Sequence, residues 1–157
     1  MASINRSDPI ILGHVLAEHR ELFTRMQSVR AALADDLPPT AARFHEIRTA
    51  LADLREHLQA HFEQEERGGF MEESISRMPR LAPAATAILR QHPALLAELD
   101  ALIERLAGLA GGGDISAEAW ARAGRDFEHF ATAMQAHERS ENTVVQEGYN
   151  EDLGLLD

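Results

Sequence analysis

Cysteine is absent from this sequence of 157 residues. Without it, the chain has no disulfide, no thiolate-bound zinc, no cysteine-held iron–sulfur cluster and no cysteine nucleophile. Disulfides persist mainly in oxidising compartments. A chain without them is compatible with any compartment and slightly favours the cytoplasm, which is where we expect this protein.

Long apolar runs and strand-forming residues are also scarce. No stretch approaches the roughly 18 consecutive apolar residues of a transmembrane helix, and residues 1–9 lack the apolar segment of a signal peptide. Aromatic residues make up only 5% of the chain, while alanine, leucine, glutamate and arginine are abundant. This composition predicts a soluble, all-α protein that does not enter a membrane.

Basic residues are in the minority, with 15 Lys and Arg against 26 Asp and Glu and a formal net charge of −11. Such a charge argues against nucleic acid and against anionic membrane surfaces as the main partner. The length suits one domain over residues 1–157, which is large enough to bury a core without disulfides.

Proline and glycine are concentrated in three breaks along the chain, around Pro38 and Pro39, over residues 67–83, and in the glycine run that ends at Asp114. The breaks separate four predicted helices, followed by a short tail at 148–157. The helices cover about 8–35, 40–66, 84–110 and 117–147. The connections predict an up-down four-helix bundle over about 8–147.

Details at the helix ends follow from single residues. Asp8, Thr40 and Ser116 are placed to cap the first, second and fourth helices. Segment 67–83 is the one long connection; it has no clear period, although a short extra turn over Glu72 to Met78 is an alternative. Pro93 either kinks the third helix or marks its start.

Two helices carry a histidine followed four residues later by a glutamate, on a face otherwise occupied by apolar residues. The pairs are His61 and Glu65 in helix 40–66, and His137 and Glu141 in helix 117–147. Residues four apart differ by only about 40° in direction around an α-helix. Both members of a pair can therefore reach the same metal ion or adjacent ions.

Single histidines, His19 and His92, interrupt the apolar stripes of the other two helices. One inward histidine is usually a satisfied core residue. Four of them on four helices, with two matching glutamates, would be costly to bury without partners. We interpret the six residues as a dinuclear non-haem iron site; a metal-free interaction bundle is the competing interpretation.

The other four histidines are weaker candidates. His14 is expected on the flank of its helix and His45 in solvent. His57 is one turn before His61 and is more easily read as a boundary residue than as an additional ligand. For His129 a solvent position is favoured over a role at the site.

Neighbours of the six residues are expected to play supporting parts. Three glutamates near predicted ligands are interpreted as surface charge: Glu18, Glu66 and Glu138. An apolar shell that keeps bulk water from the metals is predicted to consist of Phe23, Phe62, Phe130 and Met134.

Taken together, these motifs resemble the hemerythrin-like, or HHE cation-binding, family over about residues 10–147. The family signature is a histidine on the first and third helices and His-x-x-x-Glu on the second and fourth. The resemblance implies a hemerythrin-like four-helix bundle with two metals, in which the glutamates bridge and the histidines bind terminally. The implied ligands are His19, His61, Glu65, His92, His137 and Glu141.

The sequence departs from the oxygen-carrying hemerythrins at two positions. Those proteins have a second histidine one turn after the third-helix histidine, where this chain has Leu96. They also have an aspartate on the fourth helix, where this chain has Glu141. The chain is therefore more similar to the four-histidine, two-glutamate branch, which includes iron-cluster repair proteins and the iron-sensing domain of a ubiquitin ligase.

The ligand count implied by the resemblance points to small-ligand chemistry. Four histidines and two bridging carboxylates fill about eight of roughly twelve octahedral positions on two iron ions, and a bridging oxide or hydroxide takes about two more. About one position per iron stays open. We expect a protein that binds or senses dioxygen or nitric oxide. The alternatives are a redox enzyme acting on peroxide or nitric oxide, and a protein of iron storage, delivery or repair; manganese or zinc could replace iron.

Overall fold

The computed structural model describes residues 8–34, 40–67, 70–110 and 116–154, and within them the side chains of residues 13–34, 40–67, 71–109 and 116–148. These stretches are helical almost throughout and contain no strand. The elements are α1 (Asp8–Ala34), α2 (Ala41–Arg67), α3 (Phe70–Arg77), the 3-10 turn η2 (Pro79–Leu81), α4 (Ala82–Ala110) and α5 (Ala117–Gly154).

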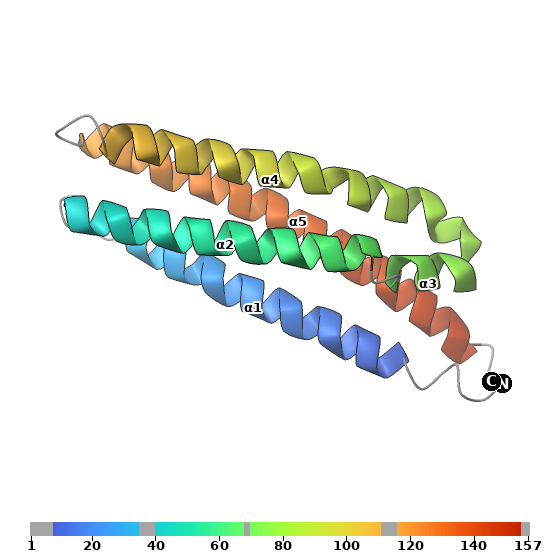
Figure 1. Ribbon diagram of the computed structural model, residues 1–157. Helices are drawn as coiled ribbons and strands as arrows, with labels where there is room; N and C mark the ends of the chain where they lie inside the picture. The colour runs from blue at the N-terminus through green and yellow to red at the C-terminus, as the bar shows by residue number, and fades with distance from the viewer. Residues whose placement is uncertain (1–7, 35–39, 68–69, 111–115, 155–157) are drawn as a thin grey trace.

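The four long helices form an up-down bundle, with the short α3 at one end (Figure 1). α1 packs against α2 and α5, and α4 packs against the same two helices. Each long helix thus has two neighbours, and α1 lies diagonally opposite α4. This arrangement confirms the predicted all-α, up-down bundle, and it lets one layer of side chains from all four helices meet at the bundle axis.

Most predicted helix ends lie within a few residues of the observed ones. Thr40 caps α2, since its Oγ1 accepts from Arg43 N at 3.2 Å. Ser116 caps α5 in the same way, with its Oγ accepting from Ala119 N at 3.1 Å. Asp8 is the first residue of α1, and its side chain lies outside those described. α5 continues to Gly154, beyond the predicted end at residue 147.

The long connection between α2 and α4 is more ordered than its sequence suggested. Residues 70–77 form α3, and η2 follows directly. Met71, Met78 and Leu81 turn inward and are at most 5% exposed. The alternative of a short turn over 72–78 was therefore closer to the structure than an irregular connection, because three apolar anchors fix this segment against α5.

Pro93 lies inside α4, which runs without interruption from Ala82 to Ala110. The helix therefore does not begin at Pro93, one of the two alternatives that the sequence left open. Proline has no N–H, so the carbonyl one turn earlier, at Leu89, loses its usual helical donor. The break in hydrogen bonding falls next to His92.

Two separate apolar clusters fill the bundle. The larger one occupies the half that contains Leu22, Leu58, Leu95 and Phe130. The smaller one lies at the α3 end and includes Met71, Met78, Leu81, Ala85, Ile88 and Val144. Along α4 and α5, the predicted metal ligands stand between residues of the two clusters. The bundle axis therefore carries a polar layer with apolar packing above and below it.

Phe23 was predicted to join the apolar shell, and this prediction was wrong, since Phe23 is 49% exposed. The buried positions of α1 follow steps of three and four residues through His19, Leu22 and Met26 to Leu33. At about 100° per residue, Phe23 points roughly 80° away from the centre of that stripe. Its place directly after buried Leu22 moves it off the inward face.

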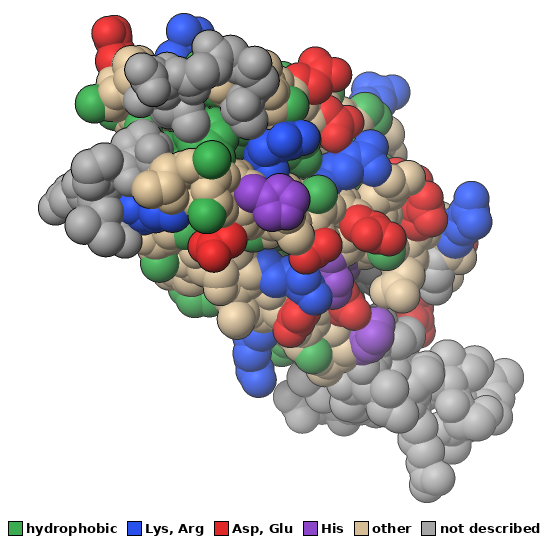
Figure 2. All heavy atoms as spheres, turned by 60° about the vertical axis from the view of Figure 1, so that its left-hand side comes forward, with side chains coloured by type: hydrophobic (Ala, Val, Ile, Leu, Met, Phe, Trp, Pro, Cys, Tyr) green, Lys and Arg blue, Asp and Glu red, His purple; other side chains and the backbone are tan. Residues whose placement is uncertain are grey.

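Charged side chains of both signs lie side by side on the surface (Figure 2). Some of them pair across neighbouring helices: Arg55 of α2 with Asp100 of α4 at 2.8 Å, and Arg30 of α1 with Glu128 of α5 at 2.5 Å. Such exposed pairs contribute about 0–1 kcal/mol each. The apolar clusters, rather than these pairs, are the main source of the stability of the bundle.

Candidate metal centre

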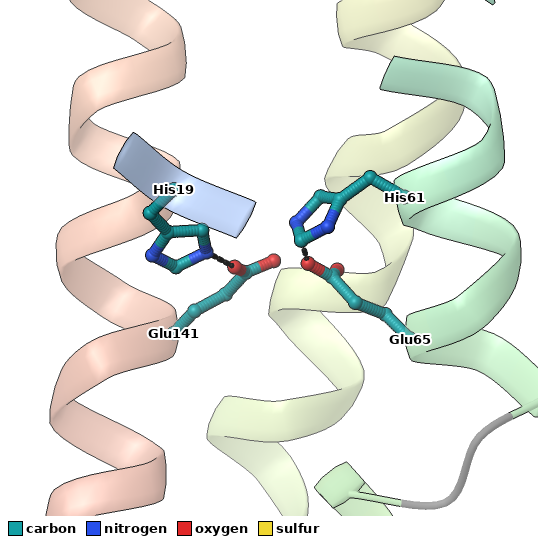
Figure 3. A group of neighbouring side chains, drawn as sticks. All are labelled: His19, His61, Glu65 and Glu141. Atoms are coloured by element: carbon teal, nitrogen blue, oxygen red, sulfur yellow. Dashed lines mark hydrogen bonds and ion pairs between the residues drawn. The ribbon is translucent and has the colours of Figure 1, made fainter. Parts of the chain in front are cut away.

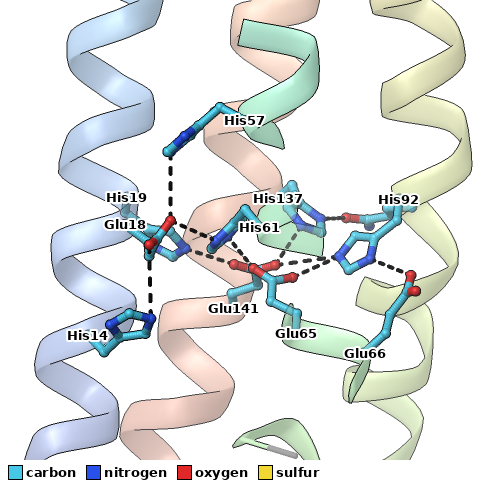
Figure 4. A network of polar contacts seen from close by, with 11 residues as sticks. His14, Glu18, His19, His57, His61, Glu65, Glu66, His92, His137 and Glu141 are labelled. Carbon is cyan, nitrogen blue, oxygen red and sulfur yellow. Dashed lines mark hydrogen bonds and ion pairs between the residues drawn. The ribbon is translucent and has the colours of Figure 1, made fainter. Parts of the chain in front are cut away.

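The six predicted ligands meet in the polar layer, and each long helix contributes at least one of them (Figure 4). All six are buried, down to 1% exposure for His92 and 0% for Glu141. α1 supplies His19, and α4 supplies His92. α2 and α5 each supply a histidine and the glutamate one turn further on. The structure therefore brings together every residue that the sequence had singled out as a ligand.

The Nε2 atoms of the four histidines all face carboxylate oxygens. His19 Nε2 lies 2.9 Å from Glu141 Oε2, and His137 Nε2 lies 2.6 Å from Glu141 Oε1. His92 Nε2 lies 2.9 Å from Glu65 Oε2. His61 Nε2 contacts Glu65 Oε1. Each glutamate thus stands between an imidazole of its own helix and one from another helix. Figure 3 shows one contact of each glutamate, His19 with Glu141 and His61 with Glu65.

The donor atoms fall into two groups, and in each group they lie within 4.8 Å of one another. One group is His19, His61, Glu65 and Glu141; the other is Glu65, His92, His137 and Glu141. Both groups contain both glutamates. Two cations could therefore be held side by side, each by two imidazoles, with two carboxylates in common.

Hydrogen bonding within the described chain leaves this layer unsatisfied. Four imidazole nitrogens and three carboxylate oxygens of the six residues make no hydrogen bond of good geometry there, although most of them lie at ion-pair distance from one another. The atoms are Nδ1 of His19, Nε2 of His61, His92 and His137, both Oε atoms of Glu65, and Oε1 of Glu141. Unpartnered buried polar atoms cost several kcal/mol. Imidazole and carboxylate together suit Fe, Mn or Zn, so the donor set fits a pair of such cations.

Outer partners orient the histidines. His92 Nδ1 donates to Glu66 Oε1 at 3.0 Å, and His137 Nδ1 donates to Gln91 Oε1 at 2.8 Å. An imidazole that donates from Nδ1 keeps its Nε2 lone pair for a cation. These contacts therefore favour the tautomer in which Nε2 faces the centre of the layer.

The pKa values in the layer show how its charges are balanced when no metal is bound. Burial lowers the pKa of His92, but its contacts with three carboxylates outweigh burial and raise it to about 10; the carboxylates are Glu141, Glu65 and Glu66. Burial raises the pKa of Glu141, but its contacts with the imidazoles of His137, His19 and His92 hold that pKa well below its usual range. Without metal, the protonated His92 supplies positive charge to the carboxylates of the layer.

The layer has an internal two-fold correspondence that exchanges α1 with α4 and α2 with α5. His92 meets Glu65 at the same 2.9 Å at which His19 meets Glu141. The residues before the single histidines also correspond, since Gln91 faces His137 Nδ1 and Glu18 faces His61 Nδ1. The His-x-x-x-Glu pattern that α2 and α5 share in sequence is thus repeated in space.

The two halves differ just outside the ligands. Phe62 follows His61, whereas Glu138 follows His137 at the corresponding position. Oε1 of Glu138 is buried and has no hydrogen-bond partner in the part of the chain that the structure describes. Burial raises the pKa of Glu138, and the nearby His19 opposes the shift. A third carboxylate therefore acts electrostatically on the half that contains His19.

Sequence reasoning missed three of these neighbours. Glu18, Glu66 and Glu138 were predicted to be surface charge. Glu66 is exposed as predicted, yet it bonds His92. Glu18 lies near His61, and Glu138 interacts with the charge of His19. Gln91 was not singled out at all. Their common signal is adjacency in sequence to a ligand, which is weak on its own.

The remaining histidines mostly lie where they were expected. His14 and His45 are exposed, and His57 is half-buried at the boundary. His129 is exposed and pairs with Glu98 at 2.5 Å, away from the centre. Of these four, His14 and His57 approach the centre through Glu18.

Comparison with known families agrees with this geometry. The family model described as the Hemerythrin HHE cation binding domain matches residues 11–147. The chain belongs to this family, and the residues that met in the polar layer all fall within the match. Searches of curated proteins and of solved structures found no match. Among the described residues, no helix is long and apolar enough to cross a membrane.

Proposed function

We propose that the chain holds two iron ions in this centre and uses them to bind or sense dioxygen or nitric oxide. The observation that supports this most directly is that two four-donor groups share both of their carboxylates. Independent single-ion sites would not need common glutamates. The pattern supports assignment to the four-histidine, two-glutamate branch, with Glu65 and Glu141 as the bridging ligands.

An iron pair supplies redox chemistry and coordination positions that the six side chains leave open. The chain supplies the rest. The four imidazoles, with Nε2 directed inward, bind and separate the two ions. The apolar clusters on both sides of the layer exclude bulk water, which strengthens electrostatic interactions within it. Inward-directed imidazoles and the exclusion of bulk water are both features of a site that receives a small molecule.

The metal content of single-residue variants tests whether the two ions share the two carboxylates. We expect about two iron atoms per chain after anaerobic reconstitution with ferrous iron. Glu141→Ala should lose both ions, because both donor groups contain Glu141. His19→Ala should keep about one, because only one group contains His19. Glu63→Ala, an exposed position on α2, is the control. Equal loss in the Glu141 and His19 variants would argue against a shared pair.

Titration of the reduced, iron-loaded protein with dioxygen or nitric oxide tests the function. Binding or sensing predicts stoichiometric changes in the near-ultraviolet and visible spectrum with no sustained consumption of the gas. Steady turnover of nitric oxide or peroxide would instead favour the redox enzyme. Rapid loss of iron to a weak chelator would favour storage or delivery.

A further inference from the structure

The two halves of the polar layer are closed differently from outside. Phe62 fills the space beside one half, because its ring contacts both imidazoles of that half. The centroid of the ring lies 3.8 Å from that of His92, with the two planes nearly parallel, and 5.4 Å from that of His137, with the planes at 71°. Phe62 is itself buried. On this side, a small molecule could reach an ion held by the two histidines only by displacing the ring.

Glu138 occupies the corresponding position in the other half. The exchange of α1 with α4 and of α2 with α5 carries Phe62 onto Glu138 and places the carboxylate beside His19. The electrostatic surroundings agree with this placement. Burial raises the pKa of Glu138, and the charge that opposes this rise most strongly is that of His19, ahead of those of His61 and His137. A carboxylate, rather than an aromatic ring, therefore borders the half that contains His19.

The half that contains His19 is also the less tightly closed of the two. Oε1 of Glu138 and Nδ1 of His19 are both buried and have no hydrogen-bond partner among the described residues. In the other half, Nδ1 of His92 and Nδ1 of His137 each bond to an outer partner. His19 is the most exposed of the six ligands, at 7% against 1% for His92. An unused carboxylate oxygen thus lies next to the more accessible half.

A carboxylate in this place affects what can bind beside it. Like charges repel strongly where bulk water is excluded, and their juxtaposition is a common way to reject a wrong partner. Glu18 adds a second negative charge to the same half, with Oε2 3.6 Å from Nδ1 of His61 (Figure 4). Metal cations nearby favour the ionised form of both carboxyl groups. An anion is therefore disfavoured in this half, and a neutral molecule is not.

We propose that the small ligand binds to the ion held by His19 and His61, and that Glu138 borders this position and rejects anions. Phe62 closes the equivalent position in the other half. The centre thus selects a neutral diatomic molecule, such as dioxygen or nitric oxide, over anions such as chloride or azide. This inference rests on the proposed dinuclear function, because it needs an iron pair with open coordination positions.

The experiment compares a small anion, azide, with a small neutral molecule, nitric oxide. Wild-type protein and Glu138→Gln are loaded with iron, and the iron content of each is measured. Azide is titrated into the oxidised form and nitric oxide into the reduced form, and visible absorption follows both. The matched control is Glu63→Gln, which removes an exposed carboxylate from α2. Far-ultraviolet circular dichroism verifies that all three proteins are folded.

We expect about two iron ions per chain in all three proteins, and about one azide per iron pair at saturation. Glu138→Gln should bind azide roughly ten-fold more tightly or better, because a like charge in a water-poor site is removed. Its affinity for nitric oxide should change by less than about three-fold, because a neutral ligand is not repelled by the carboxylate. Glu63→Gln should match the wild type with both ligands.

Three results would overturn the proposal: an unchanged azide affinity in Glu138→Gln, two azide ions per iron pair, or an equal gain in affinity for azide and nitric oxide. The absence of azide binding in every iron-loaded protein would overturn it as well, because no open position would then exist. Failure of the wild type to bind two iron ions would contradict the dinuclear function instead.

Discussion

The ring of Phe62 lies flat against the imidazole of His92, with ring centroids 3.8 Å apart and 4° between the planes. His92 is thereby held from three sides, by Phe62, by Glu66 at Nδ1 and by the carboxylate of Glu65 at Nε2. At the position that corresponds to Phe62, the other half of the centre has Glu138. One half is thus covered by an aromatic ring, and the other is bordered by a carboxylate.

Replacing Phe62 separates its packing role from its role at the centre. Phe62→Leu should lower the free energy of unfolding by about 2 kcal/mol, because roughly three buried carbons are lost. Phe127→Leu, at another fully buried phenylalanine, should cost a similar amount. Only Phe62→Leu should accelerate metal loss to a chelator, because His92 loses its stacked support. Equal chelation rates in the two variants would limit Phe62 to packing.

Removing Glu66, which accepts the hydrogen bond from His92 Nδ1, tests whether such outer partners support metal binding. Glu66→Ala should weaken metal binding by about 10–100-fold, the usual effect of losing an outer partner of a ligating histidine. Glu56→Ala, at an exposed position on the same helix, is the control. Competition with a chelator of known affinity measures both. An unchanged affinity in Glu66→Ala would show that the 3.0 Å contact does not orient His92.

Metal binding should release protons at neutral pH, because His92 of the metal-free protein has a pKa of about 10. Its ordinary pKa is about 6.5. In the metal-free protein, the stability contributed by this raised pKa is therefore fully present below about pH 6.5. It is lost as the pH rises through about 10.

A cation must displace this proton, so the apparent affinity should rise about ten-fold per pH unit for each proton displaced. Calorimetric titration in buffers of different ionisation enthalpy measures the number released. We expect one or more protons per loaded chain at pH 7. A value of zero would be inconsistent with a protonated His92 in the metal-free layer.

Two glycines of α5 should respond to substitution in opposite directions. A Cβ at Gly124 would meet nothing within 4 Å, so Gly124→Ala should stabilise the protein by about 0.5–1 kcal/mol through helix propensity. A Cβ at Gly148 would lie 3.2 Å from Cβ and Oγ of Ser74 on α3. Gly148→Val should therefore destabilise it by about 1–3 kcal/mol. Thermal unfolding of both variants provides the comparison.

The sequence was sufficient to predict the bundle and the convergence of the six residues, because both depend on helical periodicity. His61 continues the buried face of α2 three residues after Leu58. The direction in which its side chain points is therefore fixed by the helix itself. Four inward directions in an up-down bundle must meet near one axis. The direction of each ligand does not depend on where its helix ends, so the prediction was not affected by errors at helix ends such as the one at the end of α5.

The outer contacts could not be predicted, because they depend on how two helices are placed relative to each other. Glu66 points away from the stripe of α2, and only the position of α4 brings it to His92. Glu18 likewise faces His61 across the contact between α1 and α2. Phe23 shows the opposite error, since hydrophobicity alone suggested burial although its direction on α1 leads to solvent.

The polar layer joins all four long helices in a chain that has no cysteine. A metal pair held there would tie His19 to Glu141, across 122 residues of sequence. It would therefore act as a reversible cross-link that can be broken by chelation or by acid rather than by reducing agents. Removing the ions should loosen the folded chain as reduction loosens a disulfide-bonded one, and adding them back should restore it.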